Sequence, residues 1–302
     1  MPPIVTRVQC VPFERSVIES YPARSHWDAE AADLVRTMLE RWHLSAGEAF
    51  VGGEAAATLR VTTREGSPAV LKVGFPHIEA THEAVALEAW CGAGLAPAVL
   101  RQDPWTWSML LEEVRPGASL SSIDSREALD AAAGLLARLH STASPSGTPS
   151  LEQIMREYIA HARAAKSSDE PASSTQLIER GLDEAERLLA ETHDIVLLHG
   201  DFNPGNVLAG ADGSWVAIDP KPMTGDPAFD LFPLSEQLGD LAGAPDRLRA
   251  ASSIIECDPQ RAIRWAFVRS ALNVSWYLSD GDRDASKTAA SEAAMWLELS
   301  EL

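Results

Sequence analysis

The chain has 302 residues, enough for two lobes or small domains with sizeable buried cores. Hydrophobic residues make up 45% of it and charged residues 23%, which excludes global disorder. The net charge is -19, and a chain without a basic stripe is a poor match for nucleic acid. The sequence has no apolar run of the roughly 18 residues that a membrane span needs and no start that resembles a signal peptide. We therefore expect a cytoplasmic protein without a membrane partner.

Cysteine usage and charge distribution refine this picture. The three cysteines, Cys10, Cys91 and Cys257, lie far apart without CxxC spacing, which favours reduced thiols over disulfides or zinc. Residues 1–116 hold 10 basic and 15 acidic residues, whereas residues 117–302 hold 15 and 29. The net charges are thus -5 and -14. The acidic second part indicates either general solubility or a cationic ligand.

The first third of the chain mixes helices and strands. Apolar residues at helical spacing predict an amphipathic helix over 25–44. Short apolar or β-branched runs predict strands at 56–64, 69–75 and 107–114. The density of Ala, Leu and Glu over 77–90 predicts another helix between the second and third strands.

The pattern becomes mainly helical after Pro116. Helical spacing predicts helices at 127–140, 151–165, 182–192, 261–278 and 287–298. Polar loops rich in Ser and Pro are expected at 141–150 and 167–175, and strand-like runs occur only within 195–219. We expect an α+β chain with a small β-rich N-terminal lobe at 1–116 and a larger, mainly helical C-terminal lobe at 117–302.

Polar residues gather in 197–231, after one strand-like run and at the end of another. Asp201 and Asn206 are close in sequence, and Asp219 follows at the end of the second run. Two carboxylates and an amide in this arrangement can converge on one cation and one hydroxyl, and their oxygen atoms suit Mg²⁺. A set of Asx-turns and loop caps is the alternative for these residue types.

The sequence HGDFNPGN followed by IDP resembles the catalytic loop and metal-binding motif of the protein-kinase-like superfamily. Together with GDPAFDL and RWAFVRSALNVSWYL, it is most similar to the aminoglycoside phosphotransferases, within the group of streptomycin 6-phosphotransferases and hydroxyurea-resistance kinases. The similarity extends from about Trp27 to Trp276. It implies a two-lobed protein-kinase-like fold that transfers a phosphoryl group from ATP, with Mg²⁺, to a small molecule.

The resemblance also implies roles for single residues. Asp201 would accept or orient the proton of the acceptor hydroxyl. Asn206 and Asp219 would hold Mg²⁺ against the nucleotide phosphates. His199 is expected to organise the loop and not to act as a base.

A kinase of this kind needs a lysine on a central strand of its small lobe. Lys72 is the only lysine in the first 165 residues, and its apolar neighbours make an unpaired charge there costly. We expect its partner on the following helix, where the resemblance favours Glu83, with Glu88 as second choice; the resemblance also implies that Lys72 reaches the phosphates. A surface lysine on an edge strand is the alternative.

Four further residues are candidates for nucleotide binding. Gly52 and Gly53 could fold over phosphates through their backbone N–H groups, although a hairpin turn explains two adjacent glycines nearly as well. By resemblance, the backbone of Glu112 and Val114 would meet adenine.

Acceptor candidates lie in the second part of the chain: Glu236, Asn273, Trp276, Tyr277 and Asp280. A solvated helix face explains most of them equally well. Asp226 and Asp230, in GDPAFDL, are expected to cap and tie the helix that follows.

We therefore expect an ATP-dependent O-phosphotransferase that acts on a small cationic antibiotic, most simply an aminoglycoside of streptomycin type. The first alternative is a kinase of the same group that acts on hydroxyurea or a metabolite. The second is a pseudokinase that binds nucleotide without turnover, against which Lys72, Asp201, Asn206 and Asp219 argue because all four are intact.

Overall fold

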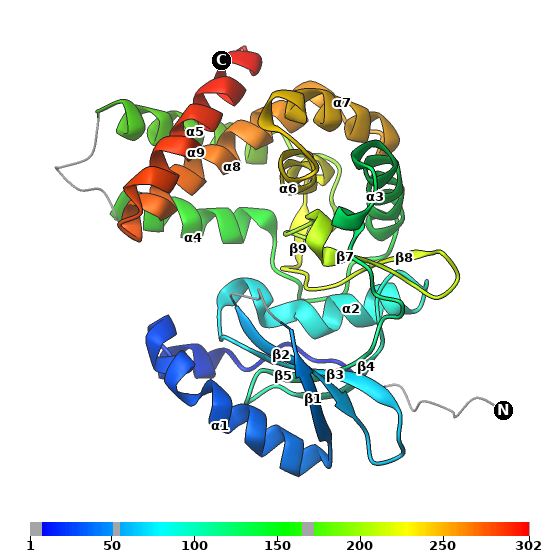
Figure 1. Cartoon of the computed structure of the whole chain (residues 1–302). Coiled ribbons are helices and arrows are strands. Elements are labelled where there is room, and N and C mark those ends of the chain that lie inside the picture. The colour runs from blue at the N-terminus through cyan, green and yellow to red at the C-terminus, as the bar shows by residue number, and fades with distance from the viewer. Residues whose placement is uncertain (1–7, 51–54, 165–171, 302) are drawn as a thin grey trace. The chain divides into compact units, whose positions relative to one another are not determined.

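The computed structural model describes residues 8–50, 55–164 and 172–301 (Figure 1). The chain divides into two compact units. One unit comprises Met1–Ser119 with Asn206–Pro222, and the other comprises Leu120–Gly205 with Met223–Leu302. The lobe boundary expected after residue 116 stays a prediction, and the hairpin that follows Asn206 belongs to the first unit.

A five-stranded antiparallel sheet forms the centre of the first unit, in the order β1-β2-β3-β5-β4. Its strands are β1 (Ser45–Ala49), β2 (Ala56–Thr62), β3 (Pro68–Gly74), β4 (Val99–Asp103) and β5 (Ser108–Glu112). The predicted strands correspond to β2, β3 and β5. Strands β1 and β4 were not predicted. The exposed β1 segment, SAGEA, has no alternation of apolar and polar residues.

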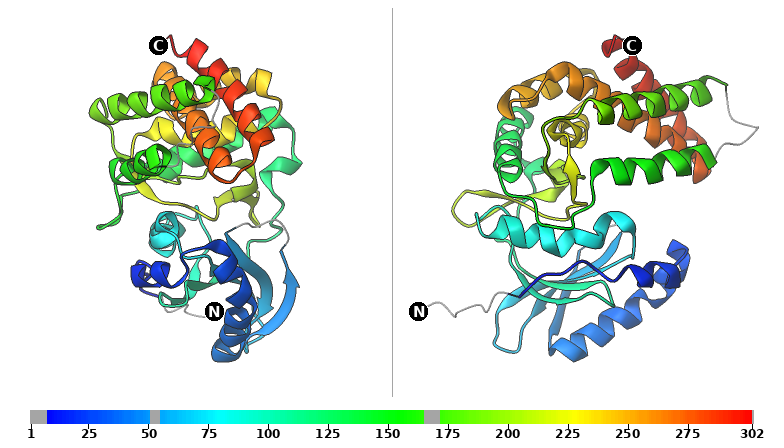
Figure 2. Two further views of the ribbon diagram at one scale, coloured as in Figure 1. Left: turned by 90° about the vertical axis from the view of Figure 1, so that its left-hand side faces the viewer. Right: turned by 180° about the vertical axis from the view of Figure 1, so that it is seen from behind.

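Helices lie on both sides of this sheet (Figure 2). The predicted N-terminal helix, α1 (Arg24–Trp42), buries tryptophan and methionine side chains in one core with Leu71 and Val73 of β3. Because successive side chains of a strand point to opposite faces, Lys72 points away from that core. On its side of the sheet lies α2 (Glu83–Cys91), the second half of the region predicted as a helix over 77–90. The first half is a short 3₁₀ helix, Ile78–His82.

The first unit also contains a short hairpin of β7 (Val207–Ala209) and β8 (Trp215–Ala217). Backbone hydrogen bonds fasten both strands to the unit. The N–H of Ala217 donates to Leu95 O at 2.8 Å, and the N–H of Gly117 donates to Ala209 O at 3.0 Å. The segment that leads to Asp219 is thereby held against the first unit.

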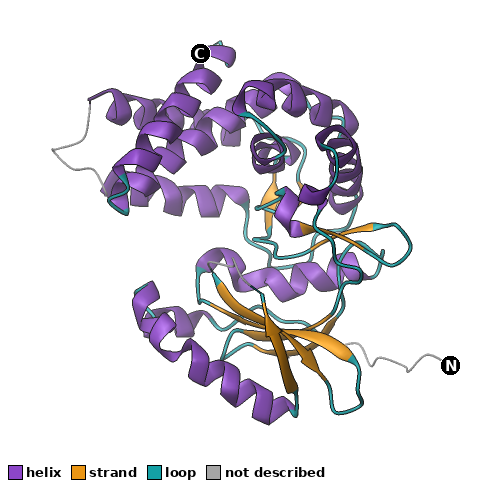
Figure 3. Ribbon diagram, in the orientation of Figure 1, coloured by secondary structure: helices purple, strands orange, loops and turns teal. Residues whose placement is uncertain are grey.

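The second unit consists mainly of helices (Figure 3). They are α3 (Ser125–His140), α4 (Leu151–Ala164), α5 (Ala172–Ala190), α6 (Leu231–Gln237), α7 (Ala244–Ile254), α8 (Pro259–Ser279) and α9 (Arg283–Leu299). Two short antiparallel strands accompany them, β6 (Val196–Leu198) and β9 (Met223–Gly225). The predictions for α3, α4, α8 and α9 are confirmed to within a few residues. Residues 172–175, predicted as loop, instead begin α5, and α6 and α7 were not predicted.

Helix α8 is the central helix of the second unit. Eleven of its residues are buried, and α5, α6, α7 and α9 pack around it. It approaches α5 so closely that a Cβ on Gly181 would lie 2.4 Å from the Cβ of Ala271. Only glycine therefore fits at position 181 without a shift of the backbone. Among the described helices, none is both long enough and apolar enough to span a bilayer.

Candidate functional site

In the first unit, Lys72 lies between two carboxylates. Its Nζ is 2.5 Å from Oε1 of Glu83, and it also forms an ion pair with Asp219. The lysine is 8% exposed and Glu83 is 3% exposed, so this pair is almost completely shielded from water. Glu83 is thus the partner of Lys72, as the sequence predicted, and their role toward a nucleotide stays a prediction.

Burial and charge act in opposite directions on this cluster. Burial disfavours the charged form of Lys72, but the charges of Asp219 and Glu83 outweigh it and raise the pKa of the ammonium group. Burial raises the pKa of Glu83 to about 7, against the attraction of Lys72 and with a further contribution from Asp219. One ammonium group shared by two carboxylates leaves an excess of negative charge that suits a cation.

Asn206 and Asp219 lie on the two sides of the open end of the β7–β8 hairpin. The N–H of Ile218 donates to the backbone O of Asn206 at 2.9 Å, so the residue before Asp219 is paired with Asn206. Asp219 has a left-handed backbone with φ of 56°, which is uncommon for a residue other than glycine. Its side chain is 54% exposed. A carboxylate and an amide with access to solvent match the few protein ligands that Mg²⁺ takes.

Asp201 lies in the second unit, on a loop whose backbone is held by the buried Asp230. Asp230 accepts hydrogen bonds from the N–H groups of His199 at 2.8 Å and Gly200 at 2.7 Å. It also pairs with Nε2 of His140 at 3.0 Å. Burial alone would raise the pKa of Asp230, but His140 and the groups around His199 lower it overall. The loop that carries Asp201 is therefore anchored by a buried carboxylate.

Side chains within the loop complete its conformation. His199 is fully buried, and its Nδ1 accepts a hydrogen bond from the N–H of Asp201 at 3.3 Å. Nδ2 of Asn203 donates to Oδ1 of Asp201 at 3.3 Å. These contacts agree with the structural role expected for His199. They also orient the Asp201 carboxylate from within its own loop.

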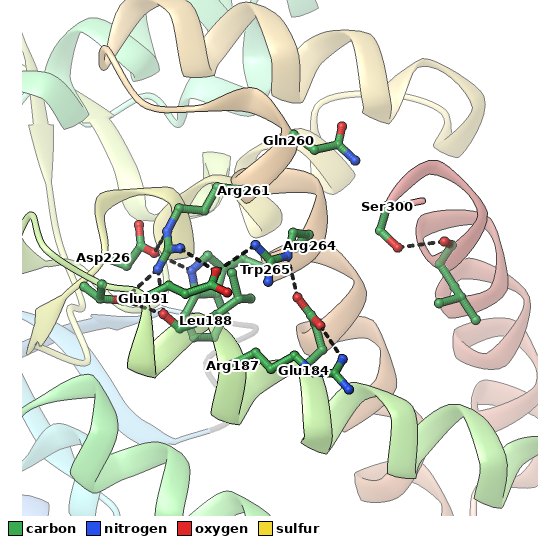
Figure 4. A network of polar contacts seen from close by, with 12 residues as sticks. Glu184, Arg187, Leu188, Glu191, Asp226, Gln260, Arg261, Arg264, Trp265 and Ser300 are labelled. Atoms are coloured by element: carbon green, nitrogen blue, oxygen red, sulfur yellow. Dashed lines mark hydrogen bonds and ion pairs between the residues drawn. The ribbon is translucent and has the colours of Figure 1, made fainter. Parts of the chain in front are cut away.

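Asp226 anchors a network of charged side chains that joins α5 to α8 (Figure 4). Its Oδ1 accepts from the N–H of Ala228, which caps the short helix as expected. Its Oδ2 pairs with Arg261 and accepts from the indole N–H of Trp265 at 2.7 Å. The network continues through Glu191 and Arg264 to the buried Glu184. Both carboxylate oxygens of Asp226 have protein partners, so this network has a structural role.

Most of the predicted acceptor residues lie on α8 or at its end. Asn273, Trp276 and Tyr277 belong to the helix, and Asp280 is its C-cap. Their spacing of three and four residues places them along one helix face. Trp276 packs edge-to-face on Tyr158 of α4, with ring centroids 5.2 Å apart.

Glu236, the remaining acceptor candidate, lies on α6 and is half-buried. Burial raises its pKa to about 7, with a contribution from Glu292, while Arg269 acts in the opposite direction.

The other nucleotide candidates are placed only in part. Gly52 and Gly53 lie outside the described residues. Glu112 is the last residue of β5, with its N–H bonded to Ala98 O at 2.9 Å, and Val114 lies two positions beyond. Their roles toward adenine stay predictions.

Sequence reasoning missed His140 and Arg269. They reach Asp230 and the carbonyl of Gly200 over 90 and 69 positions, so no local pattern could have found them.

A five-stranded sheet with a buried Lys–Glu pair, and a helical unit with an anchored Asp loop, define a protein of the protein-kinase-like class. Choline kinase LicA from Streptococcus pneumoniae matches with a TM-score of 0.68 at 16% identity, over 88% of this chain and 98% of that chain. A thermostable mutant of aminoglycoside phosphotransferase APH(4)-Ia, in a ternary complex with ADP and hygromycin B, matches with a TM-score of 0.62 at 16% identity, over 87% and 97%. At such identities the likeness establishes the fold.

Within this class, the chain belongs to the aminoglycoside/hydroxyurea antibiotic resistance kinase family, whose model matches residues 41–281. It is 33% identical to streptomycin 6-kinase of Streptomyces glaucescens over 264 residues, 84% of this chain and 85% of the relative. It is 35% identical to hydroxyurea phosphotransferase of Kitasatospora aureofaciens over 272 residues, 89% and 76% of the two chains. The resemblance drawn from the HGDFNPGN and IDP motifs is thereby confirmed.

Proposed function

We propose that this protein is an ATP-dependent O-phosphotransferase that phosphorylates a hydroxyl group of a small cationic antibiotic, an aminoglycoside of streptomycin type. The observation that carries the proposal is the buried Lys72, held between Glu83 and Asp219. Burying charged groups is costly, and packed apolar side chains would stabilise the fold at least as well. Binding of nucleotide phosphates by Lys72 explains why a charged ammonium group is kept at this buried position.

In this proposal each group has a separate task. Lys72 neutralises nucleotide phosphates, and Glu83 fixes the position of its ammonium group. Asp201 orients the acceptor hydroxyl and accepts its proton as the new O–P bond forms, while the bond between the γ-phosphorus of ATP and its bridging oxygen breaks and ADP leaves. Asn206 and Asp219 would hold Mg²⁺, which supplies charge neutralisation at the phosphates when it is bound. Gly52, Gly53, Glu112 and Val114 complete the proposed nucleotide contacts.

The face of α8 is our proposed place for the acceptor. Asn273, Trp276, Tyr277 and Asp280 offer one amide, two aromatic rings and one carboxylate along this face, and Glu236 adds a carboxylate from α6. The second part of the chain carries most of the net negative charge of -19. Carboxylates bind guanidinium and ammonium groups through charge-assisted hydrogen bonds, so this composition favours a cationic acceptor.

A second acceptor class is supported by one observation, the 35% identity to hydroxyurea phosphotransferase. Hydroxyurea is neutral and much smaller than an aminoglycoside, so it needs no acidic surface. A third alternative, a nucleotide-binding protein without turnover, conflicts with the presence of Lys72, Asp201, Asn206 and Asp219 in one chain.

Turnover assays across acceptor classes test the proposal. ATP consumption is measured with streptomycin, other aminoglycosides, hydroxyurea and no acceptor, and the phosphorylated position is determined by mass spectrometry and NMR. Streptomycin-dependent ADP release supports the proposal when Asp201→Asn abolishes it. Turnover with hydroxyurea alone would establish the second class, and nucleotide binding without turnover on any acceptor would establish the third.

A further inference from the structure

We propose that Arg269 is a positioning residue for phosphoryl transfer, because it holds the peptide group that precedes Asp201. The inference rests on the proposed function only in taking Asp201 as the catalytic carboxylate. Arg269 belongs to α8, far from the HGD motif in sequence, and is half-buried in the second unit. Its Nη1 donates to the carbonyl oxygen of Gly200 at 3.3 Å.

Both backbone polar groups of Gly200, the N–H and the carbonyl, form hydrogen bonds to side chains. Its N–H donates to Asp230 at 2.7 Å, while its carbonyl accepts from Arg269. The residue has a φ of 80°, in the left-handed region where glycine moves more freely than other residues. The peptide group between Gly200 and Asp201 is held at its carbonyl by Arg269 and at its N–H by the 3.3 Å hydrogen bond from Asp201 to Nδ1 of His199, so loss of the Arg269 contact leaves it anchored at one end only. Arg269 therefore restrains the backbone orientation from which the Asp201 side chain projects.

The guanidinium group is itself firmly placed. Its Cζ lies 4.5 Å from the ring centroid of Phe229 and 5.7 Å from that of Phe232. The same Nη1 also donates to the carbonyl of Phe229 at 3.3 Å. Since Phe229 immediately precedes Asp230, one guanidinium connects the Asp201 loop with the segment that anchors it. A planar group stacked on an aromatic ring holds this geometry better than a flexible ammonium group.

Arg269 also links the loop to the proposed acceptor face. Asn273 follows it by four residues, one helical turn further along α8. The helix that presents the acceptor candidates is therefore the same helix that fixes the carbonyl next to Asp201. A small displacement of α8 would change both positions together. Misplacement by about 1 Å can lower a rate on the order of 100-fold, so this coupling is large enough to matter.

The test separates positioning from general stability. Arg269→Met retains an unbranched stem against Phe229 and Phe232 but removes both hydrogen bonds. Arg264→Met is the matched control, because Arg264 lies on the same helix and instead pairs with Glu184 and Glu191. Steady-state kinetics with ATP and streptomycin, thermal melts and Mg·ATP calorimetry are measured for both variants.

We expect Arg269→Met to lower kcat by 10- to 100-fold while KM for ATP and the calorimetric affinity change less than about twofold. Arg264→Met should lower the melting temperature and leave kcat within about twofold. In Arg269→Ala, millimolar guanidinium should restore part of kcat, and it should restore none in Asp201→Asn. If Arg269→Met does not fold, Arg269→Lys is measured, with an expected loss of about 3- to 10-fold in kcat.

Three results would overturn the inference: wild-type kcat in folded Arg269→Met or Arg269→Lys, an equal loss of kcat in both methionine variants, or no response of Arg269→Ala to guanidinium. These outcomes are distinct from failure of the proposed function. The proposed function fails if wild-type protein shows no acceptor-dependent turnover or if Asp201→Asn retains full activity. Asp201 would then not be a catalytic carboxylate, and Arg269 would have no catalytic group to position.

Discussion

Asp230 accepts a hydrogen bond at 2.7 Å from the backbone N–H of Gly200, the residue before Asp201, across 30 positions of sequence. The carboxylate is fully buried and also pairs with His140. Removing one partner from a buried, hydrogen-bonded pair costs on the order of 3 kcal/mol. We expect Asp230→Asn to lower the free energy of unfolding by about that amount at pH 7, measured by urea unfolding. A loss below about 1 kcal/mol would contradict this role.

The same residue predicts an acid dependence. The folded-state pKa of Asp230 lies below its ordinary value of 3.8. Its contribution to stability is therefore complete above the pKa of the unfolded chain and is lost as pH falls through the lower, folded-state value. Unfolding measured from pH 6 downward should show a smaller acid-induced decrease for Asp230→Asn than for wild type. If the unfolding free energies of wild type and Asp230→Asn decrease in parallel with falling pH, carboxylates other than Asp230 cause the acid-induced loss of stability.

Asp201→Asn tests the catalytic carboxylate. Asparagine has nearly the same shape but cannot accept the hydroxyl proton, so kcat should fall by a factor on the order of 100 or more. Nucleotide affinity should change little, because Lys72 and its partners are untouched. Kinetics and ATP calorimetry on the same preparation make the comparison. Full activity in a folded variant would remove Asp201 from the proposed mechanism.

Metal dependence separates Asp219 from Asn206. Asp219→Ala removes a charged ligand and a partner of Lys72, so it should abolish turnover and weaken Mg·ATP binding. Asn206→Ala removes a neutral ligand and should be partly rescued by high Mg²⁺ or Mn²⁺. Asp212→Ala, on the exposed turn of the same hairpin, is the control and should behave as wild type. An unchanged Mg²⁺ dependence in both site variants would refute the assignment.

Glu236 should make the protein less stable as pH rises. Burial, aided by Glu292, raises the pKa of Glu236 from 4.5 to about 7. Its contribution to stability is therefore present in full below the unfolded-state pKa and is lost as pH rises through about 7. Glu236→Gln should flatten the decrease in unfolding free energy between pH 5 and 8, whereas the exposed Glu298→Gln should leave it unchanged. Equal slopes in wild type and Glu236→Gln would contradict the raised pKa.

Salt tests the charge of the acceptor. If a cationic acceptor is drawn to an acidic surface, its KM should increase with KCl through physiological ionic strength, where the Debye length is about 8 Å. Streptomycin KM is measured over a KCl series, with KM for ATP determined in the same buffers. A streptomycin KM indifferent to salt, or turnover of neutral acceptors alone, would assign the net charge to solubility.

The sequence alone determined the features that local pattern encodes. Apolar residues at helical spacing predicted α1, and a short apolar run predicted β3, with Lys72 between the apolar residues Leu71 and Val73. The cost of burying that charge required a partner on the next helix, which the structure supplies as Glu83. Asp201, Asn206 and Asp219 indicated a magnesium-dependent phosphoryl transfer, because all three residues belong to two short motifs, HGDFNPGN and IDP, which resemble those of the protein-kinase-like superfamily.

Only the tertiary structure decided which distant residues hold those motifs in place. Asp230, at the end of the short helix Pro227–Asp230, and Arg269, on α8, hold the N–H and the carbonyl of Gly200 through hydrogen bonds. Backbone groups are the same in every residue, so such contacts leave no signature in the composition or periodicity of either segment. The exposed β1 segment, SAGEA, likewise becomes a strand by pairing with β2 and not by its own pattern. Pairing and anchoring over long separations depend on the packing of the whole chain.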